Sequence, residues 1–520
     1  MINHWWVTRP KRKLTSVPEV LATFADMALD QEWQGHISTQ LNMEEALEQA
    51  GLKRVGDRRD KGGGGARTYL AWLKSLGLIF EQDKTRLLKL TLAGEDILNG
   101  APPVKVLTHQ VLRYQYPSFF SVSRGVNLNS RFKIHPFWFL LKLLRDGRLE
   151  GYLTQEEIAK VVIVEAEKET DACYNAVIES ILRFRSYGPG CIDEDSYEEK
   201  YSSARSGNAD GSSIFDKLID TANTFINWLE YTQLIYRFKG KISVLAERES
   251  EVDDIIADHL PFIERPMEEE YFQRKYGVGP YRDKDTRNLT EYKTITQAII
   301  AERRIRNAFI QYSVKTPVFA LNDDVIFHIC HSSGLDEKTV RSTLISYFPH
   351  GAINAFMTNY FEMAFKGRED ATEFEKATRE IFAKVFRFDA YHVGPIGLTP
   401  DVHIISNMDG YQGIIDNKAY SAYSISNDHH NRMVDNYIGN LRNYSQSPLP
   451  LAFFTYIAGG FCKSIDSQLD EITAVTGIKG SAVTVRDIVE MVSKHQRNPY
   501  SHEQLRRIFS VGRQVMLSDL

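Results

Sequence analysis

Residues 399–420 constrain the fold most, because two short runs rich in β-branched residues flank a turn signal there. The first run spans 402–406, the second spans 413–419, and Asp409-Gly410 lies between them. Asp-Gly is among the strongest short-range signals for a tight hairpin turn. We therefore predict two antiparallel strands joined at this dipeptide.

Charged side chains gather on one face of this predicted hairpin. Because side chains alternate between the two faces of a strand, Asp416 and Lys418 share a face. Ile415 and Asn417 then point to the opposite face. Asp401 lies beside the first pair if the strands pair around the turn. Two carboxylates and one ammonium are thus expected to converge at a sheet edge.

This combination of groups suits phosphodiester hydrolysis. Carboxylates are the hard oxygen ligands that Mg²⁺ prefers, and the ion also keeps waters and accepts phosphate oxygens. A lysine beside the ion can position or deprotonate the attacking water, while the ion stabilises charge on the phosphate. The spacing of these three residues is not specific by itself, because such a pattern often arises by chance in a chain of this length. An ordinary surface hairpin with a solvated Asp–Lys pair is the alternative interpretation.

The segment from Thr378 to the C-terminus resembles the FokI-type cleavage domains of the PD-(D/E)XK nuclease superfamily. The similar stretches follow one another in order: 379–386, Pro400-Asp401, 413–421, 428–434, 451–456 and 469–473. The resemblance implies that Asp401 and Asp416 are metal ligands and that Lys418 is the catalytic lysine. It adds Asn417 to the metal-binding set. The implied fold of this part is an α/β nuclease domain.

Two helices around the hairpin carry further candidate residues. Glu375, on the helix before it, is a possible outer metal contact or else a solvated helix glutamate. Asp428 and Arg432 are spaced i, i+4 and share a helical face. The resemblance implies that they form a dimer contact, and the alternative is an intrahelical surface pair. His429 and His430 point about 100° apart on a helix, which favours surface placement over metal binding.

A chain of 520 residues is too long for one hydrophobic core, so we expect several domains. Its 43% hydrophobic and 25% charged residues are typical of a soluble globular protein. We predict a recognition module at 1–103, a second recognition region at 104–260, a helical linker region at 261–370 and a nuclease domain at 371–520. Within the linker region, residues 276–287 are rich in glycine and charge and are interpreted as a connector between recognition and cleavage parts.

Net charge and cysteine content exclude several classes of protein. A net charge of −5 argues against a uniformly basic nucleic-acid coat but allows a local basic patch. None of the four cysteines forms a Cys-x-x-Cys pair, which makes a disulfide framework or zinc site unexpected. The sequence shows no signal peptide and no apolar run of membrane-spanning length. We expect a protein of the bacterial cytoplasm.

The first recognition module is predicted to be a winged helix-turn-helix. Residues 18–100 suggest three helices followed by a hairpin, with strands at 78–80 and 87–90. The first helix opens at Pro18, the second near Asn42, and the third spans 66–76. In this class of fold the third helix enters the major groove of DNA.

The loop before that third helix is the most basic loop of the chain. Residues 53–67 contain six basic residues against two acidic ones, and glycines at 62–65 allow close approach to a phosphate backbone. Arginine can also bind guanine through two hydrogen bonds. A flexible, solvated loop is the alternative. The predicted DNA-binding residues here are Lys53, Arg54, Arg58, Arg59, Lys61 and Arg67.

The second recognition region begins with a Pro-interrupted loop, 113–120, that mixes hydrogen-bond donors with aromatic residues. Arg113 and Gln115 are predicted to contact DNA, although the aromatic residues beside them are equally suited to packing. This loop resembles one in the AlwI-type family of site-specific restriction and nicking endonucleases. Residues 227–236 echo 71–80, which indicates a weak internal repeat of winged-helix modules.

Together these features predict a multidomain protein with mainly α-helical winged-helix recognition modules and a C-terminal α/β nuclease domain. The predicted function is a Mg²⁺-dependent type IIS endonuclease that cuts DNA at a fixed distance from a short asymmetric site. Expected partners are double-stranded DNA, a second copy through a transient dimer on DNA, and a cognate DNA methyltransferase. The alternatives are a strand-specific nicking endonuclease and a non-catalytic winged-helix regulator.

Overall fold

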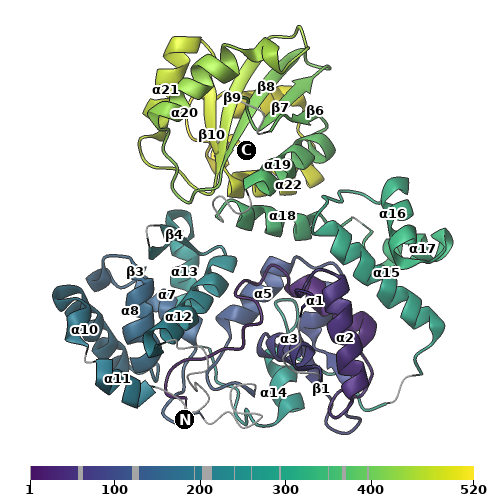
Figure 1. The fold of residues 1–520 in the computed structure, drawn as a ribbon, viewed down its shortest axis with the longest axis vertical. Helices are drawn as coiled ribbons and strands as arrows, with labels where there is room; N and C mark the ends of the chain where they lie inside the picture. Colours follow the sequence, from purple (N-terminus) through teal and green to yellow (C-terminus); the bar gives the residue numbers. More distant parts are fainter. Residues whose placement is uncertain are drawn as a thin grey trace. The chain divides into compact units, whose positions relative to one another are not determined.

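The computed structural model describes residues 2–56, 62–119, 128–192, 194–201, 213–238, 240–258, 260–291, 294–349, 351–365, 371–394 and 398–520. These residues form two compact units (Figure 1). The first comprises Met1–Gln311 with Phe327–Tyr347, and the second comprises Tyr312–Ile326 with Phe348–Leu520. The region 261–370, expected as a helical linker, is therefore divided between the two units.

The first unit opens with three helices and a hairpin, in the order expected from the sequence. Their bounds are α1 Val17–Met27, α2 Ile37–Gln49, α3 Gly64–Ser75, β1 Ile79–Glu81 and β2 Leu88–Leu90. The strands pair antiparallel, with Ile79 opposite Leu90. Helix α2 begins at Ile37, before the expected start near Asn42, because its buried face already includes Gln40, whose amide donates to the Trp33 carbonyl at 2.8 Å.

A second helix-plus-hairpin follows in the same unit. Helix α12 (Ile214–Tyr231) leads into β4 (Ile235–Phe238) and β5 (Lys241–Val244), and β3 (Leu153–Thr154) completes a sheet of order β3-β5-β4. Trp72 and Trp228 hold matching, fully buried positions in α3 and α12. Gly77 and Gln233, five residues further on, both have left-handed backbones, with φ of 67° and 61°. The repeat seen in the sequence thus extends to the backbone.

The remaining elements of the chain before the sheet of the second unit are helical. Their bounds are α4 Leu92–Leu98, α5 Pro103–Leu112, α7 Pro136–Leu144, α8 Gln155–Glu157, α9 Ile163–Glu165, α10 Asp171–Tyr187, α11 Glu194–Tyr201, α13 Glu249–Ala257, α14 Glu269–Tyr276, α15 Gln297–Ser313, α16 Asp323–Ser333, α17 Glu337–Tyr347 and α18 Ile353–Met363. In the described residues, no helix is long and apolar enough to cross a membrane.

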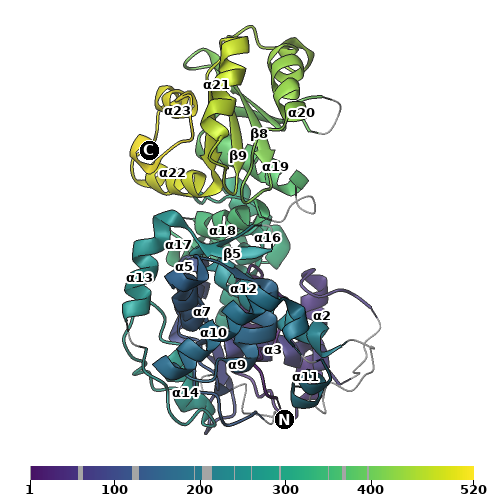
Figure 2. The same ribbon diagram turned by 90° about the vertical axis from the view of Figure 1, so that its left-hand side faces the viewer.

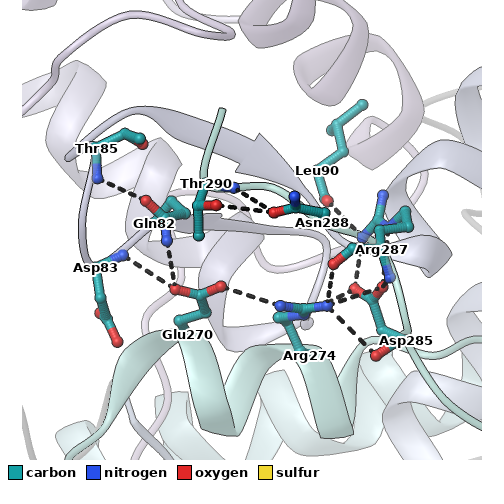
Figure 3. Close-up of polar contacts among 10 residues, drawn as sticks. All are labelled: Gln82, Asp83, Thr85, Leu90, Glu270, Arg274, Asp285, Arg287, Asn288 and Thr290. Atoms are coloured by element: carbon teal, nitrogen blue, oxygen red, sulfur yellow. Dashed lines mark hydrogen bonds and ion pairs between the residues drawn. The ribbon is translucent and has the colours of Figure 1, made fainter. Parts of the chain in front are cut away.

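Residues 276–287, interpreted as a connector, instead pack within the first unit. Figure 3 shows Arg274 of α14 bonded to Glu270 on one side and to Asp285 on the other. Glu270 in turn accepts from the side chain of Gln82 and the backbone of Asp83, at the tip of the β1–β2 hairpin. Arg287, which pairs with Asp285, also donates to the Leu90 carbonyl of β2 at 3.0 Å, so these charges have partners within the first unit.

The second unit is built on a five-stranded mixed sheet of order β10-β9-β8-β7-β6. Strands β6, β7 and β8 are antiparallel, whereas β8, β9 and β10 are parallel. The predicted hairpin is confirmed, since Ser406 pairs with Tyr411 around the Asp409-Gly410 turn and Gly410 has φ of 69°. The strands are β6 Asp389–His392, β7 Val402–Ser406, β8 Tyr411–Lys418, β9 Leu451–Ala458 and β10 Gly480–Thr484.

Helices cover both faces of this sheet and enclose two separate apolar cores. One core includes Phe374 of α19 (Ala371–Glu380), Ile488 of α22 (Val485–Arg497) and Leu505 of α23 (His502–Phe509). The other includes Met433, which follows α20 (Asn427–Asn431), and Leu469 of α21 (Ile465–Thr476). Figures 1 and 2 show α20 and α21 beside the strands of this unit.

Candidate active site

The β7–β8 hairpin brings Asp401, Asp416 and Lys418 together. Asp401 immediately precedes β7, and Val402 lies opposite Ile415, so Asp401 is beside Asp416. The Nζ of Lys418 lies 2.7 Å from Oδ2 of Asp416. The backbone N–H of Asn417 donates to Oδ2 of Asp401 at 2.6 Å. The antiparallel register therefore gathers the three side chains that strand alternation placed on one face.

Burial sets the electrostatics of this cluster. Asp416 is only 2% exposed, and its Oδ1 is buried without a hydrogen-bond partner. Burial, followed by the neighbouring Asp416 carboxylate, holds the pKa of Asp401 well above its ordinary value. Burial lowers the pKa of Lys418, but the carboxylates of Asp416 and Asp401 outweigh it and leave that pKa above its ordinary value. Two carboxylates thus share one ammonium.

The donor set fits a divalent cation. The partnerless Oδ1 of Asp416 and the crowded carboxylate of Asp401 are oxygen ligands whose mutual repulsion a bound cation would relieve. Within the ranges that the structure describes, no group of three or more His, Cys, Asp or Glu side chains is arranged to hold a metal. Any further ligands at this site would be waters, main-chain oxygens or substrate oxygens, as is usual for Mg²⁺.

The side chain of Asn417 points away from the carboxylates. Its Nδ2 donates to Oγ1 of Thr378 on α19 at 2.6 Å, and that hydroxyl also bonds the hydroxyl of Tyr360 on α18. Asn417 contacts the acidic cluster only through its backbone N–H. Its side chain therefore ties β8 to α19, and only its main chain is available to the site.

Glu375 lies near the cluster but is held by a histidine. Its Oε2 is 2.9 Å from Nε2 of His392, at the end of β6. Its negative charge is also among the causes that raise the pKa of Asp401. Sequence reasoning did not identify His392, because 17 residues separate it from Glu375 and no pattern indicates that α19 packs on β6.

An aromatic wall borders the acidic cluster. Tyr456 on β9 is the strand partner of Asp416, and its ring lies 5.5 Å from the ring of Tyr423. The hydroxyl of Tyr423 is 2.8 Å from Nδ1 of His429. Burial, and then the charge of Asp416, raises the pKa of Tyr423, so this phenol stays protonated. His429, expected at the surface, is half-buried and faces this wall.

The two residues predicted for dimerisation form an intrahelical pair. Nη2 of Arg432 lies 2.9 Å from Oδ2 of Asp428, and their side chains are 44% and 66% exposed. Arg432 also acts on its neighbours, since its charge is among the causes that lower the pKa of His429. The pair is therefore open to solvent on one side and close to the site on the other.

Several of the predicted DNA-binding residues have protein partners. Nζ of Lys53 lies 2.6 Å from Glu48 and 3.0 Å from Glu44. Nη1 of Arg67 donates to Oε1 of Gln40 at 2.7 Å. Arg54 is exposed, whereas Arg58, Arg59 and Lys61 lie outside the described residues. Helix α3 is buried from Tyr69 to Ser75, so only its first turn is open to contact.

Gln115 and Arg113, predicted as DNA contacts, lie in different surroundings. Gln115 is buried, and its amide both donates to the Ile263 carbonyl at 3.1 Å and accepts from the Ile263 N–H at 2.8 Å. Arg113 lines a cavity of about 720 Å³ and has a buried Nε without a partner. Gln115 thus connects the loop to Ile263 by two hydrogen bonds, whereas the Nε–H of Arg113 remains without an acceptor.

Two family models match the chain. Residues 74–316 match "AlwI restriction endonuclease", and residues 334–516 match "FokI, cleavage domain". The second match contains the hairpin with Asp401, Asp416 and Lys418. No curated protein matches the chain.

Three solved structures are similar at low identity. Restriction endonuclease FokI is 15% identical, with 99% of this chain and 100% of that chain covered and a TM-score of 0.29. FokI bound to DNA is also 15% identical, with 89% and 84% covered and a TM-score of 0.29. The BpuJ1 endonuclease binding domain in complex with modified DNA is 13% identical, with 53% and 95% covered and a TM-score of 0.36.

Proposed function

Because this chain is an AlwI-type restriction endonuclease with a FokI cleavage domain, we propose that it is a Mg²⁺-dependent type IIS enzyme. It would recognise a short asymmetric site through its N-terminal modules and cut both strands at a fixed distance from that site. The observation that carries the proposal is the cluster that the buried Asp416 forms with Asp401 and Lys418 at the end of the hairpin. Its partner in the cell would be a DNA methyltransferase that protects the same site.

The residues of the cluster have separate tasks in this mechanism. Asp401 and Asp416 would hold the magnesium, which supplies stabilisation for the charge that develops on the scissile phosphate. Lys418, whose pKa is raised by Asp416 and Asp401, is an ammonium at neutral pH. It would therefore orient the attacking water and donate to the phosphate, rather than remove a proton. Asn417 would contribute through its main chain.

Recognition is proposed for the two helix-plus-hairpin modules, which we interpret as winged helices. The loop before α3 would contact DNA, with its glycines close to the phosphate backbone and the first turn of α3 at the base edges. Replacing Arg58 and Arg59 by Ala should lower the slope of log K against log salt by about 0.9 for each phosphate that the protein no longer neutralises. An unchanged slope would remove this loop from the interface.

Division into two units supports the separation of recognition from cleavage. Domains with their own cores can bind and act independently. A fragment of residues 1–311, the larger segment of the first unit, should accordingly bind the cognate duplex and leave it intact. Cleavage of both strands would use two cleavage units, brought together transiently on DNA by Asp428 and Arg432.

The decisive experiment is plasmid cleavage with Mg²⁺ followed by sequencing of the DNA ends. Asp416→Asn should abolish cleavage and keep specific binding, because the base contacts lie in the other unit. Asp409→Asn is the matched control, since Asp409 is an exposed carboxylate in the same hairpin. Equal cleavage by wild type and Asp416→Asn would refute the site. Nicked circles as the only product would favour the strand-specific nicking alternative.

A further inference from the structure

One donor beside the acidic cluster has no assigned task. Tyr423 and His429 form a fixed pair, with the phenol oxygen 2.8 Å from Nδ1 of the imidazole. Tyr423 itself is buried and packs on Tyr456, the strand partner of Asp416. The orientation of the imidazole is therefore set by the sheet that carries Asp416, although His429 itself lies in helix α20.

The pairing with Tyr423 determines which nitrogen of His429 is available. A protonated phenol that donates to Nδ1 leaves the proton of the neutral imidazole on Nε2. Burial lowers the pKa of His429, followed by the positive charge of Lys418, which favours that neutral form. Nε2–H is then a donor on the side of the ring away from Tyr423, in a half-buried side chain.

The charges around His429 indicate what this donor would meet. Lys418 and Arg432 are both near enough to lower its pKa, while the carboxylates of Asp416 and Asp428 act in the opposite direction. A cluster of donors next to a metal-binding carboxylate pair is the surrounding that an anionic backbone requires.

We propose that His429 is a phosphate contact, which donates from Nε2 to a phosphate oxygen of the cut strand beside the one that Lys418 faces. Tyr423 acts as its positioning residue. This inference rests on the proposed function and adds a contact that orients the strand during hydrolysis. His430, the next residue on the helix, points about 100° away and has no such role.

Two substitutions separate the nitrogens of His429. The amide of His429→Gln reaches the place of Nε2, whereas that of His429→Asn reaches only Nδ1 and can pair with Tyr423. The single-turnover cleavage rate of the full-length protein should fall roughly ten- to one-hundred-fold in His429→Asn, the usual effect of losing a hydrogen bond to a charged group. His429→Gln should lose far less. His430→Asn is the matched control and should cleave as wild type does.

A substrate series identifies the contacted phosphate. Neutral methylphosphonates, placed one at a time around the cut position, should slow wild type at one phosphate more than they slow His429→Asn. If the Asn variant cleaves as fast as the Gln variant, or if both proteins respond identically to every methylphosphonate, this inference is wrong. Failure of wild type to cut DNA at all would overturn the proposed function as well, so the two failures are distinguishable.

Discussion

Gly77→Ala tests whether the corner between α3 and β1 is as tightly built as the structure indicates. Gly77 has φ of 67°, a conformation that costs other residues about 1 kcal/mol. A Cβ here would lie 2.6 Å from Nε2 of Gln110 and 2.6 Å from the ring of Tyr276. Gln110 Nε2 donates to the carbonyls of Leu76 and Tyr276, at 3.0 and 3.1 Å, and these bonds would be displaced.

The expected destabilisation combines three effects. Backbone strain contributes about 1 kcal/mol, disturbed buried hydrogen bonds about 1–3 kcal/mol, and overpacking against Tyr276 about 1–3 kcal/mol. The free energy of unfolding of the first unit should therefore fall by roughly 3–7 kcal/mol. In a unit of this size, the midpoint temperature of thermal unfolding should fall by about 2 °C for each kcal/mol of lost stability. DNA binding should be lost at a correspondingly lower temperature.

The assay is thermal and urea unfolding of the full-length protein, followed by site-specific DNA binding. Gln233→Gly is the matched control, because Gln233 holds the same left-handed position in the second module. Relief of its strain and the greater freedom of glycine in the unfolded chain nearly offset each other, so the change should stay within about 1 kcal/mol. A Gly77→Ala protein that unfolds within about 2 °C of wild type would refute the reasoning.

Three further predictions follow from the charged groups. Asp401 has a raised pKa in the folded state, so its contribution favours folding at low pH and is lost as pH rises past 4. In EDTA at pH 8, the cleavage unit of Asp401→Asn should therefore unfold at a higher temperature than that of wild type. The Arg148 guanidinium lowers the pKa of Asp146 to about 2, so the stability it contributes is present above pH 4 and lost between pH 4 and pH 2. Because Arg148 is half exposed, Asp146→Asn should cost only about 1 kcal/mol at pH 7, a difference that urea titrations should find closing below pH 4. Asp428→Arg should convert linearisation of plasmid to slow nicking, and addition of a second protein that carries Arg432→Asp should restore linearisation. Linearisation by each single variant at the wild-type rate would exclude pairing through this helix.

The hairpin and the three charged residues could be predicted because they depend on local rules. A turn dipeptide fixes the register, and strand alternation then fixes which side chains share a face. The same rules place Asn417 on the opposite face, where its side chain bonds Thr378. The family resemblance adds Asn417 to the metal set, but only its backbone reaches the site.

The contacts of Glu375 and His429 could not be predicted, because packing between distant elements creates them. The Glu375–His392 pair requires α19 to lie on β6, and the Tyr423–His429 pair requires a loop to return to the start of α20. Neither histidine stands in a recognisable motif. The same reason applies to Gln115, whose polar side chain suggested DNA contact but is buried against the backbone of Ile263.

The segment after α14 shows a second limit of sequence reasoning. Glycines and charges are typical of connectors, but here Arg287 donates to the carbonyl of Leu90, in a hairpin almost 200 residues earlier. Tyr276 is fully buried beside Gly77, where the lack of a side chain admits its ring. Composition cannot separate a solvated charge from one that is satisfied by a remote partner, because the distinction lies in the tertiary fold.

The intrahelical Asp428–Arg432 pair explains why a proposed dimer would form only on DNA. Two free copies contain two such pairs, and a two-fold contact that exchanges them contains two intermolecular pairs, so the number of ion pairs stays the same. Exposed pairs of this kind contribute only a few tenths of a kcal/mol. Association, in contrast, costs several kcal/mol in lost translational and rotational freedom. DNA that holds two copies together removes most of that cost, so a helix that gains almost nothing by dimerising in solution can still pair two cleavage units at a cut site.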